Sequence, residues 1–138
     1  MAAGKQDTPI DREMKEYFGF SPTFFEALPE GARANEWAVM RDFQLAETAL
    51  PGKVKELIGL AVAAHIKCGY CIHFHTQAAR IHGATDEELR EACYMGGLTV
   101  QMSNALTGMR VDMTQFKGEV DRAMQFIKQQ AQQPAHKH

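Results

Sequence analysis

The chain is poor in the features that mark secreted, membrane-spanning and nucleotide-binding proteins. Its 138 residues include only three cysteines, whereas a secreted disulfide scaffold carries more of them and in even number. The most apolar run, residues 58–64, is far shorter than the roughly 20 residues that cross a bilayer. Residues 1–18 contain no apolar stretch of signal-peptide length. These absences predict a cytoplasmic protein without a membrane segment, in which paired cysteines serve redox chemistry, catalysis or metal binding.

The charge distribution and the missing cofactor motifs exclude further classes of protein. Fifteen basic and seventeen acidic residues are interspersed and leave a net charge of −2, so neither a nucleic-acid footprint nor a polybasic membrane patch is present. The sequence contains no GxGxxG and no P-loop, and no flavin or haem motif, so we expect no cofactor. A hydrophobic content of 45% is that of a globular protein, and the length predicts one domain over residues 1–138.

Strand signals are nearly absent, and helix signals recur along the chain. Thr85 and Glu88 have the spacing of a capping box, and Gly108 is placed to end the helix that follows. We therefore predict an all-α bundle of about six to seven helices, with segments at 23–28, 31–49, 51–67, 68–81, 85–106 and around 116–127. The ends, residues 1–8 and 129–138, are expected to fray, with His136 and His138 in solvent. The pair Gly96-Gly97 within a helix predicts a close helix crossing, with a local kink near an interface as the alternative.

The residues that carry chemistry are concentrated in one segment, Glu56 to His75. It contains Cys68-Gly-Tyr-Cys71, with His75 four residues after the second cysteine. If a helix begins at Cys68, the two thiols and the imidazole lie within an arc of roughly 60° on adjacent turns. On the same geometry, Tyr70 and His73 point to the other side.

Two arguments bear on which thiol is the more reactive. The thiolate is the nucleophilic form, and both a helix N-terminus and a neighbouring imidazole favour it. Cys68 is nearer the helix start, whereas Cys71 is nearer His75, and the spacing alone leaves both assignments open. Glu56 lies on the preceding apolar helix, where it either faces water or is buried close to the thiols with a raised pKa, able to relay protons.

Zinc binding is the main physical alternative to redox chemistry. Cys68, Cys71 and His75 are three suitable ligands, and a structural site needs a fourth, which could come from His65, His73 or His82. No second CxxC or HxxxH completes a standard pattern, so we predict no metal. Otherwise His65 is expected to pack or cap a helix, and His73 and His82 to lie partly exposed. Cys93, among apolar neighbours, is expected to be a small core residue.

This combination resembles a known family. Glu56, eleven intervening residues, and then Cys68-Gly-Tyr-Cys71-Ile-His-Phe-His75 are similar to the alkylhydroperoxidase D branch of the carboxymuconolactone decarboxylase family. The resemblance covers about residues 30–110, including the segment GATDEELREA. It implies an all-helical protein that assembles as a homo-trimer or homo-hexamer.

The resemblance also implies roles for individual residues. Cys71 would attack a hydroperoxide, Cys68 would resolve the product as a disulfide, and His75 with Glu56 would relay the proton. One position departs from the best-known members, which carry a histidine directly before the second cysteine where this chain has Tyr70. Tyrosine cannot act as a base near neutral pH, so the relay would be shorter or run through water, with low peroxidase activity.

The expected function is therefore that of a thiol-dependent peroxidase in antioxidant defence. Its partners would be a hydroperoxide and a dithiol reductant, either a thioredoxin-like or a lipoyl protein. The alternatives are a redox sensor or adaptor that uses the same thiols, and a zinc-binding or structural oligomer. Lactone decarboxylation is not expected, because the decarboxylase branch lacks the cysteine pair.

Overall fold

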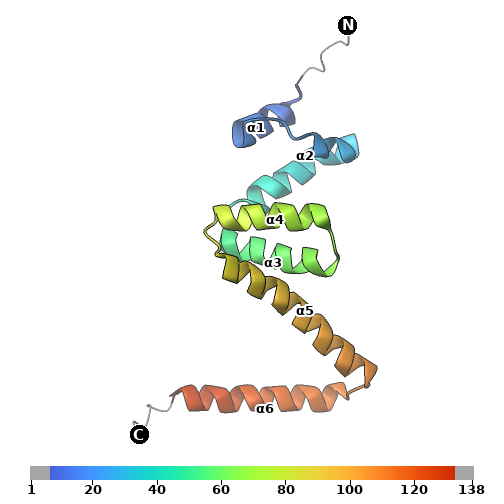
Figure 1. Ribbon diagram of the computed structural model, residues 1–138, viewed down its shortest axis with the longest axis vertical. Coiled ribbons are helices and arrows are strands. Elements are labelled where there is room, and N and C mark those ends of the chain that lie inside the picture. The colour runs from blue at the N-terminus through green and yellow to red at the C-terminus, as the bar shows by residue number, and fades with distance from the viewer. Residues whose placement is uncertain (1–6, 133–138) are drawn as a thin grey trace. The chain divides into compact units, whose positions relative to one another are not determined.

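The computed structural model describes residues 7–132, which divide after Tyr94 into two compact units. The described residues form six α-helices with one short 3₁₀ and one short π segment, and they contain no strand (Figure 1). The all-α class and the number of helices are therefore as predicted. The organisation as a single domain stays a prediction.

The N-terminal part of the first unit is built around an aromatic core. Helix α1 (Pro9–Phe18) begins with a capping box that the sequence analysis did not predict: Thr8 and Asp11 exchange side-chain and backbone hydrogen bonds, with Pro9 in the first turn. Its buried Met14 packs with Phe25 and Trp37 in one hydrophobic cluster. This cluster joins α1 to the next two elements, η1 (Thr23–Ala27) and α2 (Glu30–Val39).

The predicted helix over residues 31–49 was wrong in its second half. Helix α2 ends at Val39 and passes into the π segment η2 (Met40–Gln44), in which the Leu45 amide donates to the carbonyl of Met40. The physical reason is a tertiary contact. The ammonium of Lys55 donates to the carbonyls of Phe43 and Ala46, so these groups are satisfied without a continued helix.

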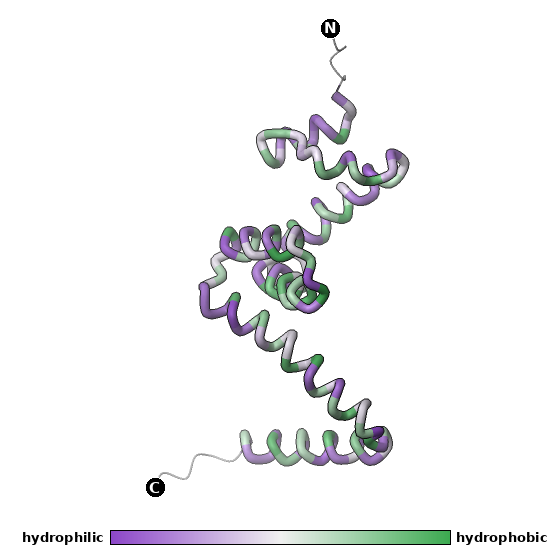
Figure 2. Tube along the Cα trace, turned by 45° about the vertical axis from the view of Figure 1, so that its right-hand side comes forward, coloured by the Kyte–Doolittle hydropathy of each residue, from purple (hydrophilic) through white to green (hydrophobic). Residues whose placement is uncertain are grey.

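Helices α3 (Gly52–His65) and α4 (Gly69–Ile81) pack side by side as a helical hairpin (Figure 1). Their connection is tight: Lys67 adopts a left-handed φ of 56°, and the Cys68 amide donates to the carbonyl of Ala63. A second cluster of buried residues joins the two helices to the first turn of the helix that follows and consists of Leu60, Ala79 and Leu89. The hydropathy colouring shows the apolar residues concentrated on α3 (Figure 2). Because the loop is so short, the end of α3 and the start of α4 lie close together.

Helix α5 (Asp86–Gly108) starts and ends where the sequence predicts. The Thr85 amide donates to Glu88 and the Glu88 amide donates back to Thr85 Oγ1, which confirms the capping box. Cys93 is exposed rather than in the core, because the packing that buries Leu89 does not extend one turn further along α5. The predicted close crossing is absent at Gly97, where an added Cβ would meet nothing within 4 Å in the described chain.

The second unit comprises the remainder of α5, a turn and α6 (Met113–Gln132). The Asp112 side chain accepts a hydrogen bond from the Gln115 amide and so caps α6. The prediction that the chain frays from residue 129 was wrong for residues 129–132, which continue α6. Residues 1–6 and 133–138, including His136 and His138, lie outside the described residues. Within residues 7–132, no helix combines the length and hydrophobicity needed to cross a bilayer.

Candidate functional site

The cysteine motif lies at the N-terminus of α4. Cys68 is the N-cap residue, and its Sγ accepts a hydrogen bond from the Cys71 amide at 3.3 Å. Both thiols are free and half-buried. A sulfur in this position replaces the usual oxygen cap, so it faces the backbone N–H groups and the positive end of the helix dipole.

The two thiols have different acidities. A hydrogen bond from the Cys71 side chain, followed by the Cys71 and Tyr70 amides, lowers the pKa of Cys68 below that of an ordinary cysteine. Donating that bond to Cys68 raises the pKa of Cys71, and desolvation raises it further. The hydrogen bond between the two thiols is therefore the main cause of the order of acidity in the resting pair, and the amides at the start of α4 lower the pKa of Cys68 further. This order does not identify the thiol that attacks a substrate.

Glu56 is completely buried in α3, so the solvent-exposed alternative is excluded. Its Oε2 lies 2.6 Å from Nδ1 of His75 on α4. With the carboxyl group ionised, Nδ1 carries the proton and donates it to Glu56, which leaves Nε2 as the basic nitrogen. The other carboxylate oxygen, Oε1, has no hydrogen-bond partner within the described residues. Such an unsatisfied buried oxygen is costly and is uncommon in a purely structural role.

Gly59 provides the space in which the imidazole sits. A Cβ at this position would lie 2.4 Å from Cε1 and 2.5 Å from Nδ1 of His75, closer than atoms can approach. Glu56 and Gly59 are three residues apart and thus share one face of α3. One turn of α3 therefore supplies both the hydrogen-bond partner and the room for the histidine. Gly59 is a functional residue that the sequence pattern does not single out, because its only signal is a glycine within a helix.

The predicted site residues thus form two contacts on one hairpin. Glu56 pairs with His75, and Cys68 pairs with Cys71. No hydrogen bond of the described residues joins the two pairs, but Cys71 and His75 lie one turn apart on α4 and are both half-buried. Tyr70 is 92% exposed, on the side away from these residues, as the helical spacing predicted.

The remaining histidines lie apart from this site. His65 and His73 are exposed, and His82 is half-buried near Glu47, with Nδ1 3.7 Å from Oε1. Within residues 7–132, no three side chains of the metal-binding types converge, so the fourth ligand that a zinc site would need is not assembled there.

Two known proteins are similar to this chain in sequence. The chain is 34% identical over 79 residues to "Uncharacterized protein 4 in cox locus" of Paracoccus denitrificans, covering 54% of this chain and 71% of that protein. It is 49% identical over 43 residues to an uncharacterized protein of Cupriavidus necator, covering 31% of this chain and 38% of that protein.

Among solved structures, the chain is similar to the alkylhydroperoxidase AhpD core of Rhodospirillum rubrum. The TM-score is 0.65 at 27% sequence identity, covering 75% of this chain and 79% of the other. The sequence profile that describes the Carboxymuconolactone decarboxylase family matches residues 27–112, which include both helices of the hairpin. The chain therefore belongs to the Carboxymuconolactone decarboxylase family, with a fold like that of the AhpD core.

Proposed function

We propose that this protein is a cytoplasmic thiol-dependent peroxidase that reduces hydroperoxides through Cys68 and Cys71. The observation that carries the proposal is the buried contact between Glu56 and His75, one helical turn from Cys71. A carboxylate that orients an imidazole beside a thiol is the arrangement by which proteins activate a nucleophile. The AhpD core of Rhodospirillum rubrum, to which the fold is similar, is named an alkylhydroperoxidase.

The first step oxidises Cys71. Its pKa is raised, so it needs a base, and Nε2 of His75 takes the thiol proton while Glu56 holds the Nδ1 proton. The thiolate attacks one peroxide oxygen, the O–O bond breaks, and His75 returns the proton to the leaving alkoxide. The products are a sulfenic acid on Cys71 and an alcohol.

The second step closes the disulfide. The Cys71 and Tyr70 amides, which lower the pKa of Cys68, remain in place after Cys71 is oxidised, and the Cys68 thiolate attacks the Cys71 sulfur. An S–S bond forms, and the sulfenic hydroxyl leaves as water after taking up a proton. A protein dithiol then reduces the disulfide by exchange through a mixed disulfide and is itself oxidised. The role in antioxidant defence follows from this chemistry.

A second candidate function is disulfide exchange or redox sensing without peroxide turnover. It is favoured by the lowered pKa of Cys68 and by the exposure of Tyr70, which stands where the best-known members of the family carry a histidine. Both functions use the same disulfide. They differ in whether a peroxide reacts with Cys71 faster than with an ordinary thiol.

Single-turnover stopped-flow kinetics with an alkyl hydroperoxide test the proposal, using the full chain and its Cys68→Ser and Cys71→Ser variants. We expect Cys68→Ser to complete one turnover and to leave a sulfenic acid that dimedone traps. Cys71→Ser should form none. Cys93→Ser is the matched control and should react like the unaltered protein, because Cys93 lies outside the motif.

Two results would overturn this scheme. Sulfenic acid on Cys68 in the Cys71→Ser variant would reverse the roles of the two thiols. A Cys71 that reacts with peroxide no faster than free cysteine, in a protein that still forms the Cys68–Cys71 disulfide with an oxidised dithiol, would favour the exchange function.

A further inference from the structure

The turn between α3 and α4 has a lysine in a backbone conformation that favours glycine. The amides of Lys67 and Cys68 donate to carbonyls in the last turn of α3, a pattern that ends a helix with one left-handed residue. That residue is Lys67, with a φ of 56°. After α1 and α4 the left-handed residue is a glycine, Gly19 or Gly83, and after α5 it is Arg110. Glycine adopts this conformation at lower cost, so the lysine side chain points to a use that glycine cannot serve.

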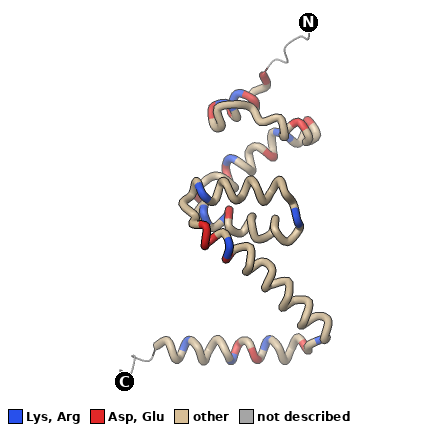
Figure 3. Tube along the Cα trace, in the orientation of Figure 1, with Lys and Arg blue, Asp and Glu red and all other residues tan. Residues whose placement is uncertain are grey.

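The hairpin around this turn contains no acidic residue. Glu56 is buried against His75, and the next acidic residue in the sequence is Asp86, which pairs with Arg80 in the last turn of α4. Residues 57–85 therefore include basic side chains and histidines but no carboxylate. In Figure 3 the turn that joins α3 and α4 is blue, with no red on it. An acidic surface that approaches the turn meets attraction and no repulsion from the rest of residues 57–85.

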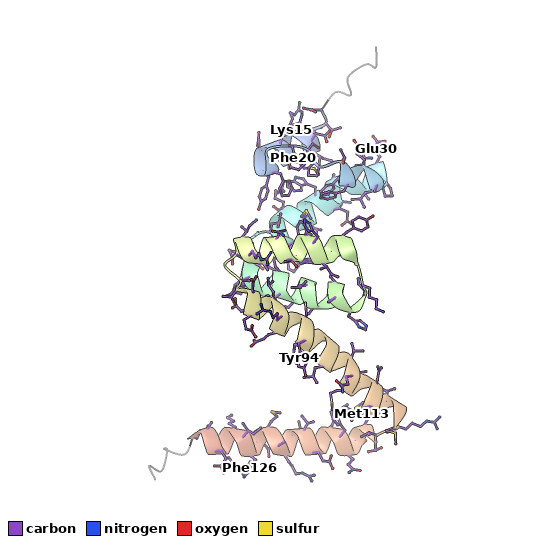
Figure 4. The ribbon with its side chains drawn as sticks, viewed as in Figure 1. Lys15, Phe20, Glu30, Tyr94, Met113 and Phe126 are labelled. Carbon is purple, nitrogen blue, oxygen red and sulfur yellow. The ribbon has the colours of Figure 1, made fainter. Side chains whose placement is uncertain are left out.

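The charge of Lys67 is not neutralised within residues 7–132. Its side chain is exposed and has no ion pair or hydrogen bond to the described residues. Lys15, which Figure 4 labels on α1, instead contacts Asp7. The other basic side chains between residues 33 and 90 also contact a carboxylate or a backbone carbonyl, and they are Arg33, Arg41, Lys53, Lys55, Arg80 and Arg90. Along this stretch, the cation without such a contact is the one that directly precedes Cys68.

Two large side chains with apolar surface flank Lys67 and Cys68 in the chain. Ile66 is 61% exposed and Tyr70 is 92% exposed. We call Ile66, Lys67 and Tyr70 the hairpin tip. Aromatic side chains are enriched where proteins bind one another, and a charge on such a surface selects between partners.

We propose that the hairpin tip docks the protein dithiol that reduces the Cys68–Cys71 disulfide, and that this partner carries acidic residues around its reactive thiol. The proposal rests on the redox role of the thiol pair proposed above. A disulfide has no charge, so Lys67 supplies the charge that the partner meets beside the oxidised pair. An acidic rim around the partner's thiol is therefore attracted to the tip, whereas a basic rim is repelled.

The exchange transfers two electrons from the partner to the disulfide. The partner's thiolate attacks one sulfur, the S–S bond breaks, and the other cysteine leaves as a thiolate and takes up a proton. The second thiol of the partner then loses its proton and attacks the partner's own sulfur in the mixed disulfide. The remaining cysteine is released and protonated, and the partner is left with a disulfide.

Reduction of the preformed disulfide by two synthetic peptides tests the proposal. Both peptides contain the same Cys-x-x-Cys dithiol, which is flanked by glutamates in one and by lysines in the other. The full chain with Cys93→Ser is first oxidised with diamide, and alkylation with mass spectrometry then gives the reduction rate at low and at high salt. Each rate is divided by the rate at which the same peptide reduces hydroxyethyl disulfide, which removes differences in intrinsic thiol reactivity. The ratio between the peptides is the charge preference.

Four variants locate the charge that sets this preference. Lys67→Gln removes it and Lys67→Glu reverses it, and both keep a side chain at the left-handed position. Arg12→Gln removes a different exposed cation, on α1. Tyr70→Ala alters the hairpin tip without changing its charge.

We expect the unaltered protein to prefer the glutamate peptide by about fivefold or more at low salt, and to lose most of this preference at high salt. Lys67→Gln should abolish the preference and Lys67→Glu should invert it, while Arg12→Gln and Tyr70→Ala retain it. Dithiothreitol, which is uncharged, should reduce Lys67→Gln as fast as the unaltered protein.

Three results would overturn the proposal: no preference in the unaltered protein, a preference that persists in Lys67→Gln, or an equal loss in Arg12→Gln. The assay contains no peroxide. A negative result here therefore leaves the peroxidase function standing, and a Cys71 that is unreactive towards peroxide leaves the charge preference standing.

Discussion

Oε2 of Glu56 lies 2.6 Å from Nδ1 of His75, across the packed surfaces of α3 and α4. Nineteen residues separate the two in sequence, and Glu56 is the one buried charged side chain among the described residues. With the carboxyl group ionised, the contact fixes the tautomer of the imidazole and holds the ring in place on α4. Removing this contact should therefore lower the reactivity of the Cys71 thiol.

The Glu56–His75 contact should increase the rate at which a peroxide oxidises Cys71. We expect His75→Gln and Glu56→Gln to slow the single-turnover reaction with an alkyl hydroperoxide by ~10²-fold or more, the scale of a lost general base. Glu47→Gln is the matched control, because it alters the carboxylate near the other half-buried histidine of the hairpin, His82. Full activity in Glu56→Gln would show that the buried carboxylate does not take part in proton transfer.

Gly59 should act as a positioning residue for His75. A side chain at position 59 must displace the imidazole from its place beside Glu56, since even a Cβ would come within 2.4 Å of it. We expect Gly59→Val to slow Cys71 oxidation by at least tenfold, as an order of magnitude for a misplaced base. Gly31→Val in α2, where a Cβ meets nothing within 4 Å, should have no effect.

A double-mutant cycle separates positioning from general destabilisation. If Gly59 acts only through His75, then adding Gly59→Val to His75→Gln should cost almost nothing further in rate. Additive effects in the double variant would instead indicate that the substitution damages the hairpin as a whole.

The pKa of Cys68 should depend on the side chain at position 71. The largest cause of its lowering is the hydrogen bond from the Cys71 side chain, with the Cys71 amide next. In a Cys93→Ser background, Cys71→Ser keeps a donor and Cys71→Ala removes it. We therefore expect thiolate absorbance to appear at lower pH in the Ser variant than in the Ala variant, and in both at lower pH than in free cysteine, because the amide bond remains.

The hydrogen bonds to Cys68 favour its thiolate form, and this sets the sign of the pH dependence of stability. They stabilise the thiolate, so Cys68 loses its proton at lower pH when folded than when unfolded, and this contribution to stability disappears as the pH falls through the folded pKa. Identical titration curves for the Ser and Ala variants would show that the side-chain hydrogen bond does not set the acidity of Cys68.

Truncating a side chain in the aromatic core of the first unit should lower the free energy of unfolding more than truncating an exposed side chain. Met14 is 1% exposed and packs against Trp37, so Met14→Ala should lower the free energy of unfolding by about 2–5 kcal/mol. Val39→Ala, at a position that is 56% exposed, should change it by less than about 0.5 kcal/mol. Urea unfolding monitored by the fluorescence of the single tryptophan provides the measurement. Equal effects of the two substitutions would contradict the assigned core.

The local geometry of the site follows from the spacing of residues along the chain. The spacing of Cys68, Cys71 and His75 places them on one side of a helix whatever surrounds it, and Thr85 with Glu88 forms its capping box from residues three apart. Such features depend only on backbone periodicity and on side chains that reach their own turn. The same periodicity predicted that Tyr70 points away from the site.

Which neighbours these residues contact depends on how the helices pack. Whether Glu56 faced water or His75 depended on how α3 packs against α4, and so did the space that Gly59 leaves for the imidazole. Cys93 lies outside the core because packing around Leu89 stops short of it. These outcomes depend on contacts between segments distant in sequence, which helical spacing does not specify.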